Sequence, residues 1–425
     1  SWSIANVTAF PGDIVTTFMT GASDAAEAVG VARYDGDGDI TGIGMFERHV
    51  SLGSNDATTT AFTNAEIGLY DFTNSEDLFF DVSGSTLSLC ATTGCHDAEL
   101  YVKAGTYYTP GGRFVVHDFE NNGTFTAGSF THEINGSWDN NATTTMTGST
   151  LVFAATSTSE TIDSTSALSA SFNNVTLGTT TGNGTWTLPS TLDVNGNFTL
   201  TRGTLARGTT AMTLAGNLDI ATNGFITGIG TTTFDGGTAA TWRNQNATLQ
   251  NSGYVVIDGT SKAVTLAGNV AAQSITIGAN DTLDASASNY DVTVYGNWSN
   301  QNNFVARSGE VFFAATTTGR TITTTGDAFF DLTFSGSGGG WSFTETTALV
   351  NNDVRVSAGT VTLPSATTTI AGSFLTTSGT FQHNNGTLYF TSGSAESVTF
   401  AGTAFTNVAR NLWFQGAGSW TVTDS

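Results

Sequence analysis

The chain has 425 residues, enough to bury a large core, yet only 11% of them are charged, whereas an ordinary globular domain carries about 25%. The formal net charge is −23, and Lys103 and Lys262 are the only lysines. This balance excludes binding of nucleic acid or anionic lipid through a basic surface. No apolar run reaches transmembrane length, so no transmembrane segment is predicted.

Residues 1–103 do not follow the pattern of the rest of the chain. Short stretches alternate apolar and polar residues, as in 67–72 and 78–82, and polar turns separate them. Such alternation predicts strands with one buried face. We expect a small β-rich N-terminal domain, either a sandwich or an irregular cap, because the first coil of a solenoid has unpaired edges that must be covered.

An acidic loop lies within this N-terminal region. Asp35, Asp37 and Asp39 alternate with glycines, and carboxylates spaced in this way can converge on a hard cation such as Ca²⁺. The loop departs from an EF-hand, since Ile40 replaces the invariant glycine and Phe46 the bidentate glutamate. A calcium site is one prediction and a solvated hairpin turn is the alternative. No other cofactor is predicted.

The chain has two cysteines, Cys90 and Cys95, which lie close together in the sequence and are followed by His96. A short-loop disulfide is the favoured prediction, because it suits an exported protein. A metal site using both thiols and His96 is the alternative, but no second Cys/His pair exists to complete it.

From residue 104 to residue 425 the sequence repeats itself. Each copy opens with a glycine, and the openings at Gly136, Gly216, Gly296 and Gly372 are almost evenly spaced. A finer step links Gly196-Asn197 to Gly216-Asn217, and its length is about one turn of a β-solenoid. We therefore predict an all-β fold, a right-handed parallel β-helix with four coils per large repeat. A string of immunoglobulin-like domains is the rival.

Strands of three to five residues fit this prediction. Segments such as 264–266 and 292–294 alternate an apolar residue with threonine, and glycine and asparagine occupy the corners between them. Tryptophan recurs at two positions of the repeat, at Trp138 and Trp298 and at Trp186, Trp341 and Trp420. These side chains are predicted to pack within the core, and an aromatic platform for sugars is the alternative.

Phrases such as Gly-Gly-Trp-Ser-Phe at 339–343 and Gly-Thr-Val-Thr-Leu-Pro-Ser at 359–365 carry a resemblance to a known class. Over roughly residues 100–425 the chain resembles long, lysine-poor tandem-repeat surface proteins of bacteria, which are similar to right-handed β-helices of the filamentous-haemagglutinin type. The resemblance implies architecture and export, and so an extracellular, cell-surface location.

The ionisable residues of the repeats do not form the clusters that a catalytic site needs. Polysaccharide-cleaving β-helices cluster carboxylates on successive coils, whereas the acids here are scattered, as in Asp219, Asp281, Asp284 and Asp331. The densest ionisable pairs, His117-Asp118 and His132-Glu133, are predicted to be surface residues. An outward acid–base or metal site is the alternative. No nucleophile or zinc motif is present, and the chain is predicted not to be an enzyme.

The predicted function is that of a structural or adhesive extracellular protein, part of a filament, sheath or surface layer. A polysaccharide-binding or polysaccharide-degrading β-helix is the alternative. The chain begins at Ser1 and stops within a repeat after Trp420, so we expect a processed or partial chain. Its last coil is expected to continue into further repeats or to associate with another copy. A glycan or a host-surface molecule is the expected ligand.

Overall fold

The computed structural model describes residue 4 and residues 7–19, 27–56, 58–71, 80–89, 98–164, 171–400 and 411–423. The fold is nearly all β, with 2% helix, and is a parallel β-solenoid of about 17 turns. Two compact units make up the chain, Ser1–Thr210 and Ala211–Ser425. The parallel β-helix predicted from the sequence is therefore confirmed, and the immunoglobulin-like alternative is wrong.

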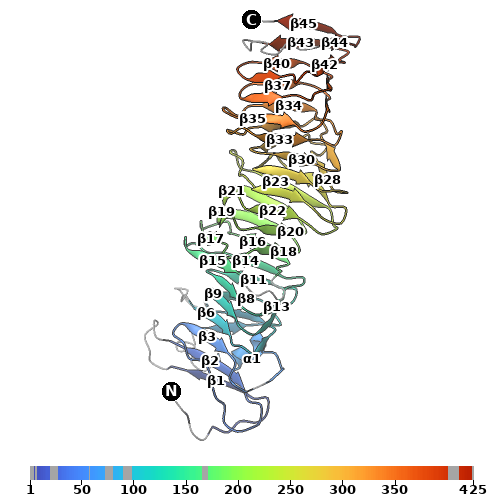
Figure 1. The fold of residues 1–425 in the computed structure, drawn as a ribbon. Helices are drawn as coiled ribbons and strands as arrows, with labels where there is room; N and C mark the ends of the chain where they lie inside the picture. The colour runs from blue at the N-terminus through green and yellow to red at the C-terminus, as the bar shows by residue number, and fades with distance from the viewer. Residues whose placement is uncertain are drawn as a thin grey trace. The chain divides into compact units, whose positions relative to one another are not determined.

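The described residues of the first unit form 19 strands and a short helical segment. The described part of this unit is drawn in blue to green in Figure 1. Its strands are β1 (Ile14–Phe18), β2 (Val29–Arg33), β3 (His49–Leu52), β4 (Asp81–Ser83), β5 (Thr86–Ser88), β6 (Glu99–Val102), β7 (Tyr107–Tyr108), β8 (Phe114–Val116), β9 (Asp118–Asn121), β10 (Thr124–Thr126), β11 (Thr131–Ile134), β12 (Trp138–Asn140), β13 (Thr143–Thr145), β14 (Thr150–Phe153), β15 (Glu160–Asp163), β16 (Asn174–Leu177), β17 (Thr185–Thr187), β18 (Leu192–Val194) and β19 (Phe198–Gly208). The helical segment comprises α1 (Asn64–Ile67) and a 3₁₀ turn (Gly68–Tyr70).

Parallel pairing in this unit starts well before residue 104. β2 pairs with β3, β3 with β6, and β6 with β9, all in parallel. Pairing therefore crosses the predicted boundary between residues 103 and 104. The antiparallel pairs among the described strands are β1–β2 and β4–β5, and they do not form a separate sandwich.

The described residues of the second unit form 26 strands, β20 to β45. They are β20 (Met212–Leu214), β21 (Leu218–Gly228), β22 (Thr231–Phe234), β23 (Ala240–Asn244), β24 (Tyr254–Ile257), β25 (Ala263–Leu266), β26 (Val270–Ala272), β27 (Ser274–Ile277), β28 (Thr282–Asp284), β29 (Val292–Val294), β30 (Trp298–Asn300), β31 (Asn303–Val305), β32 (Glu310–Phe313), β33 (Arg320–Thr323), β34 (Asp331–Phe334), β35 (Gly340–Phe343), β36 (Thr347–Val350), β37 (Val354–Val356), β38 (Thr360–Thr362), β39 (Thr367–Ile370), β40 (Phe374–Thr376), β41 (Thr380–Gln382), β42 (Thr387–Phe390), β43 (Ala395–Phe400), β44 (Asn411–Phe414) and β45 (Ser419–Thr423).

The strands of the second unit lie on three faces, and a coil with a strand on each face visits them in the order first, second, third. The first face holds β20, β22, β24, β27, β30, β33, β35, β38 and β41. The second holds β21, β23, β25, β28 and β31 and, farther along the chain, β36, β39, β42 and β44. The third holds β26, β29, β32, β34, β37, β40, β43 and β45. Leu218 pairs with Trp242 and Val264 with Leu283, so the length of one coil varies around the predicted period.

The large sequence repeat and the coil are not commensurate. The copy at Gly216 opens before β21 on the second face, the copy at Gly296 before β30 on the first, and the copy at Gly372 before β40 on the third. Each copy therefore advances three full coils plus two of the three faces. The prediction of four coils per repeat is wrong by one face, because the coils are on average longer than the predicted period.

The residue after each opening glycine clamps the following coil. The backbone N–H of a residue 24 positions later donates to its side-chain oxygen at 2.7–3.1 Å. The four clamps are Ser137 with Thr161, Asn217 with Thr241, Asn297 with Thr321, and Ser373 with Ser397. The corner is tight, because a Cβ added at Gly296 would lie 2.4 Å from the Gln273 carbonyl oxygen. The repeated Gly-Asn or Gly-Ser phrase thus joins successive coils.

Aromatic and aliphatic side chains fill the interior of both units. Trp138 stacks on Phe119 with ring centroids 4.6 Å apart, and Phe313 stacks on Phe334 at 5.4 Å. Trp138, Trp186, Trp298 and Trp341 are at most 1% exposed, and Trp420 is half-buried. The prediction that the recurrent tryptophans pack is confirmed for these four, and the sugar-platform alternative is wrong for them.

Candidate functional site

Four carboxylates gather on one outward face of the first unit. Glu120, Asp139 and Asp163 are direct neighbours on β9, β12 and β15, and Glu99 lies on the preceding strand, β6. Glu120 and Asp139 point outward because each lies between two buried residues of its strand. We call Glu99, Glu120, Asp139 and Asp163 the acidic column.

His49 binds one end of the acidic column. Its Nε2 lies 3.0 Å from Glu99 Oε2, and its Nδ1 lies 2.6 Å from the Glu47 carbonyl oxygen. The hydrogen bond to Glu99 is the main cause of the raised pKa of His49, and burial opposes it. Phe46 and Tyr101 lie beside the imidazole, with ring centroids 5.7 and 6.5 Å from it.

Two carboxyls of the acidic column, those of Glu120 and Asp139, have raised pKa values. Burial raises the pKa of Glu120, and the neighbouring Glu99 carboxyl raises it further, whereas Asn122 lowers it. Burial also raises the pKa of Asp139, with Asn141 opposing and Asp163 adding to the increase. The column therefore concentrates negative charge on one surface of the first unit, and burial favours the protonated form of Glu120 and Asp139.

The sequence did not reveal this column. The step from Glu120 to Asp139 is shorter than the step from Asp139 to Asp163, so no fixed spacing marks these residues. Glu99 pairs with His49 across a stretch of chain far longer than one ordinary coil. Their alignment depends on the register of coils of unequal length.

The predicted calcium loop is an exposed turn between β2 and β3. Asp35, Asp37 and Asp39 are all exposed, and Asp35 Oδ1 accepts a hydrogen bond from the Asp37 backbone N–H at 2.9 Å. Over the parts of the chain that the structure describes, no group of three His, Cys, Asp or Glu side chains is arranged to hold a metal ion. Calcium binding at this loop stays a prediction. Cys90, Cys95 and His96 lie outside the described residues, so the disulfide also stays a prediction.

The two His-acid pairs differ from each other. His117 Nδ1 lies 3.0 Å from Asp118 Oδ2 near the surface. His132 is fully buried, stacks on Phe114 at 4.2 Å, and has a pKa lowered to about 4 by burial. The prediction that both pairs are surface residues is wrong for His132, because strand alternation turns it inward with Ile134. Glu133 points outward and pairs with Arg113 at 2.6 Å.

The scattered acids of the repeats also have partners. Asp219 binds Arg243 and Asp284 binds Arg307, each one coil farther along. Asp281 is fully buried and accepts the Lys262 backbone N–H at 2.6 Å. For Asp219 and Asp284, the length of the coil places an arginine of the next coil beside the carboxylate.

Asp331 is also bound by the next coil, through an amide and a backbone N–H. Its Oδ1 accepts hydrogen bonds from Asn352 Nδ2 at 2.8 Å and from the Asp353 backbone N–H at 3.0 Å. All four scattered acids are therefore used to hold coils together, and they do not converge on a common point.

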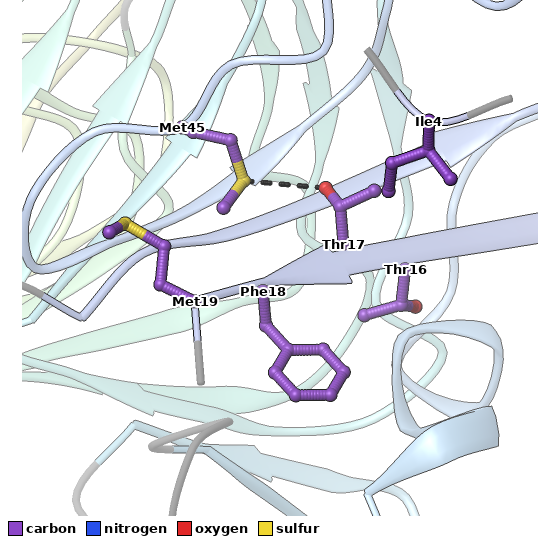
Figure 2. A pocket seen from close by; sticks show the side chains of 6 residues that line it. All are labelled: Ile4, Thr16, Thr17, Phe18, Met19 and Met45. Atoms are coloured by element: carbon purple, nitrogen blue, oxygen red, sulfur yellow. Dashed lines mark hydrogen bonds between the residues drawn. The ribbon is translucent and has the colours of Figure 1, made fainter. Parts of the chain in front are cut away.

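A pocket of about 420 Å³ opens beside β1 (Figure 2). It is lined by Ile4, Thr16, Thr17, Phe18, Met19 and Met45. Thr17 Oγ1 lies 3.3 Å from Met45 Sδ and 3.1 Å from the Gly30 carbonyl oxygen, to which it donates. None of the six lining side chains is ionisable, so the pocket offers an apolar surface without acid–base groups.

No protein-family model matches the chain, and no curated protein or solved structure is significantly similar to it. Among the residues that the structure describes, no helix is both long and apolar enough to cross a lipid bilayer.

Proposed function

We propose that this protein is a non-catalytic structural or adhesive component of an extracellular assembly, such as a filament, sheath or surface layer. The main observation in support of this proposal is that ionisable side chains of the repeats bind neighbouring coils. Arg243 with Asp219 and Arg307 with Asp284 are examples from one unit. Such pairs, together with the backbone clamps at the repeat openings, suit a scaffold built by repetition.

A relation to filamentous-haemagglutinin-type surface proteins belongs to this proposal. Its support is the parallel β-solenoid together with the low lysine content and the net charge of −23. An extracellular, cell-surface location rests on the same resemblance. A glycan or a host-surface molecule is the proposed ligand class.

The last described coil supports the proposed contact with further coils. Phe414 and Val422 are 41% and 51% exposed, although their partners one coil earlier, Phe390 and Val398, are fully buried. β44 and β45 thus leave apolar side chains exposed, which is unfavourable in water. A second copy of the chain bound at this coil would cover them.

Sedimentation velocity at several concentrations tests the contact with a second copy. The full chain is expected to associate as its concentration rises, and Val422→Asp is expected to abolish the association, because a charge would be buried at the contact. Tyr254→Asp is the matched control, since Tyr254 is 43% exposed on the first face of the same unit. A chain that stays monomeric at all concentrations, or two variants that behave alike, would argue against self-association.

The acidic column favours one alternative, a β-helix that acts on polysaccharides. Glycoside hydrolysis uses a pair of carboxyl groups, and one of them acts as an acid because its pKa is raised; Glu120 and Asp139 are neighbouring carboxyls of the column with raised pKa values. Incubation with a panel of neutral and acidic glycans tests it. The proposed function predicts no turnover. Turnover that is lost in Glu120→Gln would replace the structural proposal with the catalytic one.

A further inference from the structure

Eight outward residues on four neighbouring strands of the second unit are all uncharged. The strands β36, β39, β42 and β44 lie side by side in parallel register. Their outward residues form two columns, Thr347, Thr367, Thr387 and Asn411 in one and Leu349, Thr369, Tyr389 and Trp413 in the other. None of the eight is charged, in a chain whose net charge is −23. We call this surface the neutral face.

The second column of the neutral face ends in two aromatic rings, the half-buried Tyr389 and the exposed Trp413. Trp413 is 57% exposed and Leu349 is 41% exposed. The ring centroids of Tyr389 and Trp413 are 6.3 Å apart with an interplanar angle of 43°. Tyr389 points away from the core, because Leu388 and Phe390 on its strand are buried, and Trp413 is its register partner on the next coil. This aromatic surface is therefore separate from the buried tryptophans.

The first column places polar groups beside the rings. Thr367 and Thr387 lie two residues before Thr369 and Tyr389 on their strands, so both columns lie on the same side of the sheet. Neighbouring coils are about 4.8 Å apart, so hydroxyl and amide groups recur along the column at that interval. The neutral face thus combines a narrow apolar strip with a row of hydrogen-bonding groups.

We propose that the neutral face binds a neutral polysaccharide chain. A sugar ring has C–H faces that pack on aromatic rings and hydroxyl edges that exchange hydrogen bonds with threonine and asparagine. An acidic glycan would find no cation among these eight outward residues and would be repelled by the acidic chain. A protein partner needs about 800 Å² per side with an apolar centre, whereas the apolar strip here is one residue wide. The proposal deepens the adhesive function proposed above and rests on it.

Affinity electrophoresis of the full chain tests this assignment. The gels contain one of four neutral glycans (hydroxyethylcellulose, arabinoxylan, glucomannan or laminarin) or, as the acidic comparison, polygalacturonate. At least one neutral glycan is expected to retard the protein, and polygalacturonate is not. Trp413→Ala and Tyr389→Ala are each expected to weaken binding at least about tenfold, as removal of a central aromatic contact does.

Tyr254→Ala is the matched control, because it removes an exposed tyrosine from a different face. It is expected to bind like the unmodified chain. The melting temperature of each variant shows that the fold is kept, since the truncated side chains are outward. The proposal is overturned if none of the four neutral glycans retards the protein, if polygalacturonate binds more tightly, or if Tyr254→Ala weakens binding as much as Trp413→Ala. Sedimentation velocity tests the proposed self-association independently of glycan binding. A chain that associates but binds no neutral glycan would reject the neutral-face proposal and leave the proposed assembly standing.

Discussion

The clamp at each repeat opening makes a quantitative prediction about stability. Asn217→Ala removes the side-chain oxygen that accepts the Thr241 backbone N–H at 2.7 Å. Both residues are half-buried, so water replaces the lost partner only in part. We expect a loss of about 1 kcal/mol in the free energy of unfolding, the usual net contribution of one such hydrogen bond. For a unit of this size that corresponds to a decrease of about 2–4 °C in Tm.

Two further variants distinguish the effect of losing the clamp hydrogen bond from the effect of truncating a side chain. Asn217→Asp keeps an acceptor oxygen and is expected to retain most of the stability, since Asp353 Oδ1 accepts the Ser373 backbone N–H at 2.8 Å in the same way. Asn351→Ala removes an exposed corner asparagine of the same unit and is expected to leave Tm unchanged. Thermal melts followed by circular dichroism measure all three variants. Equal melting temperatures for Asn217→Ala and Asn351→Ala would refute the reasoning.

Three other predictions follow from the packing and the charges. Trp298→Ala should lower the free energy of unfolding by about 3–5 kcal/mol, because it empties a fully buried site, and denaturant titration measures the loss. The raised pKa values of Glu120 and Asp139 mean that the folded chain binds more protons, so the stability of the first unit should fall as pH rises above their ordinary values of 4.5 and 3.8. Glu120→Gln should flatten that decline in Tm; an unchanged profile would contradict the assignment. If Asp35, Asp37 and Asp39 hold Ca²⁺, EGTA should lower Tm, and identical melts with and without EGTA would reject the site.

Much of the fold was readable from the sequence because the repeat opening has a physical cause. The glycine permits a close approach to the previous coil, and the asparagine or serine that follows binds the next one. Alternation of apolar and polar residues then identified the strands. The start of the parallel pairing was missed, since a long segment separates Leu52 from its partner Val102 and no short period is visible there.

The acidic column could not be predicted for a related reason. Its members are neighbours only when the register of each coil is known, and the coils differ in length. His132 was also misplaced, because a polar residue was assumed to face solvent, whereas its imidazole packs on Phe114 and lies 3.0 Å from the Ala127 carbonyl oxygen. The neutral face depends on the same register, which brings Tyr389 and Trp413 together from successive coils.

Electron–electron distances within one column test the stacked-coil scaffold most directly. Thr213 and Thr323 lie on the same column of the first face, five coil steps apart, and Thr276 lies three steps from Thr213. At about 4.8 Å per step, the backbone separations are roughly 24 Å for the first pair and roughly 14 Å for the second. Spin labels at these outward positions should report distances that increase in that proportion. Distances that do not increase with the number of coils between the labels would contradict the scaffold on which the proposed function rests.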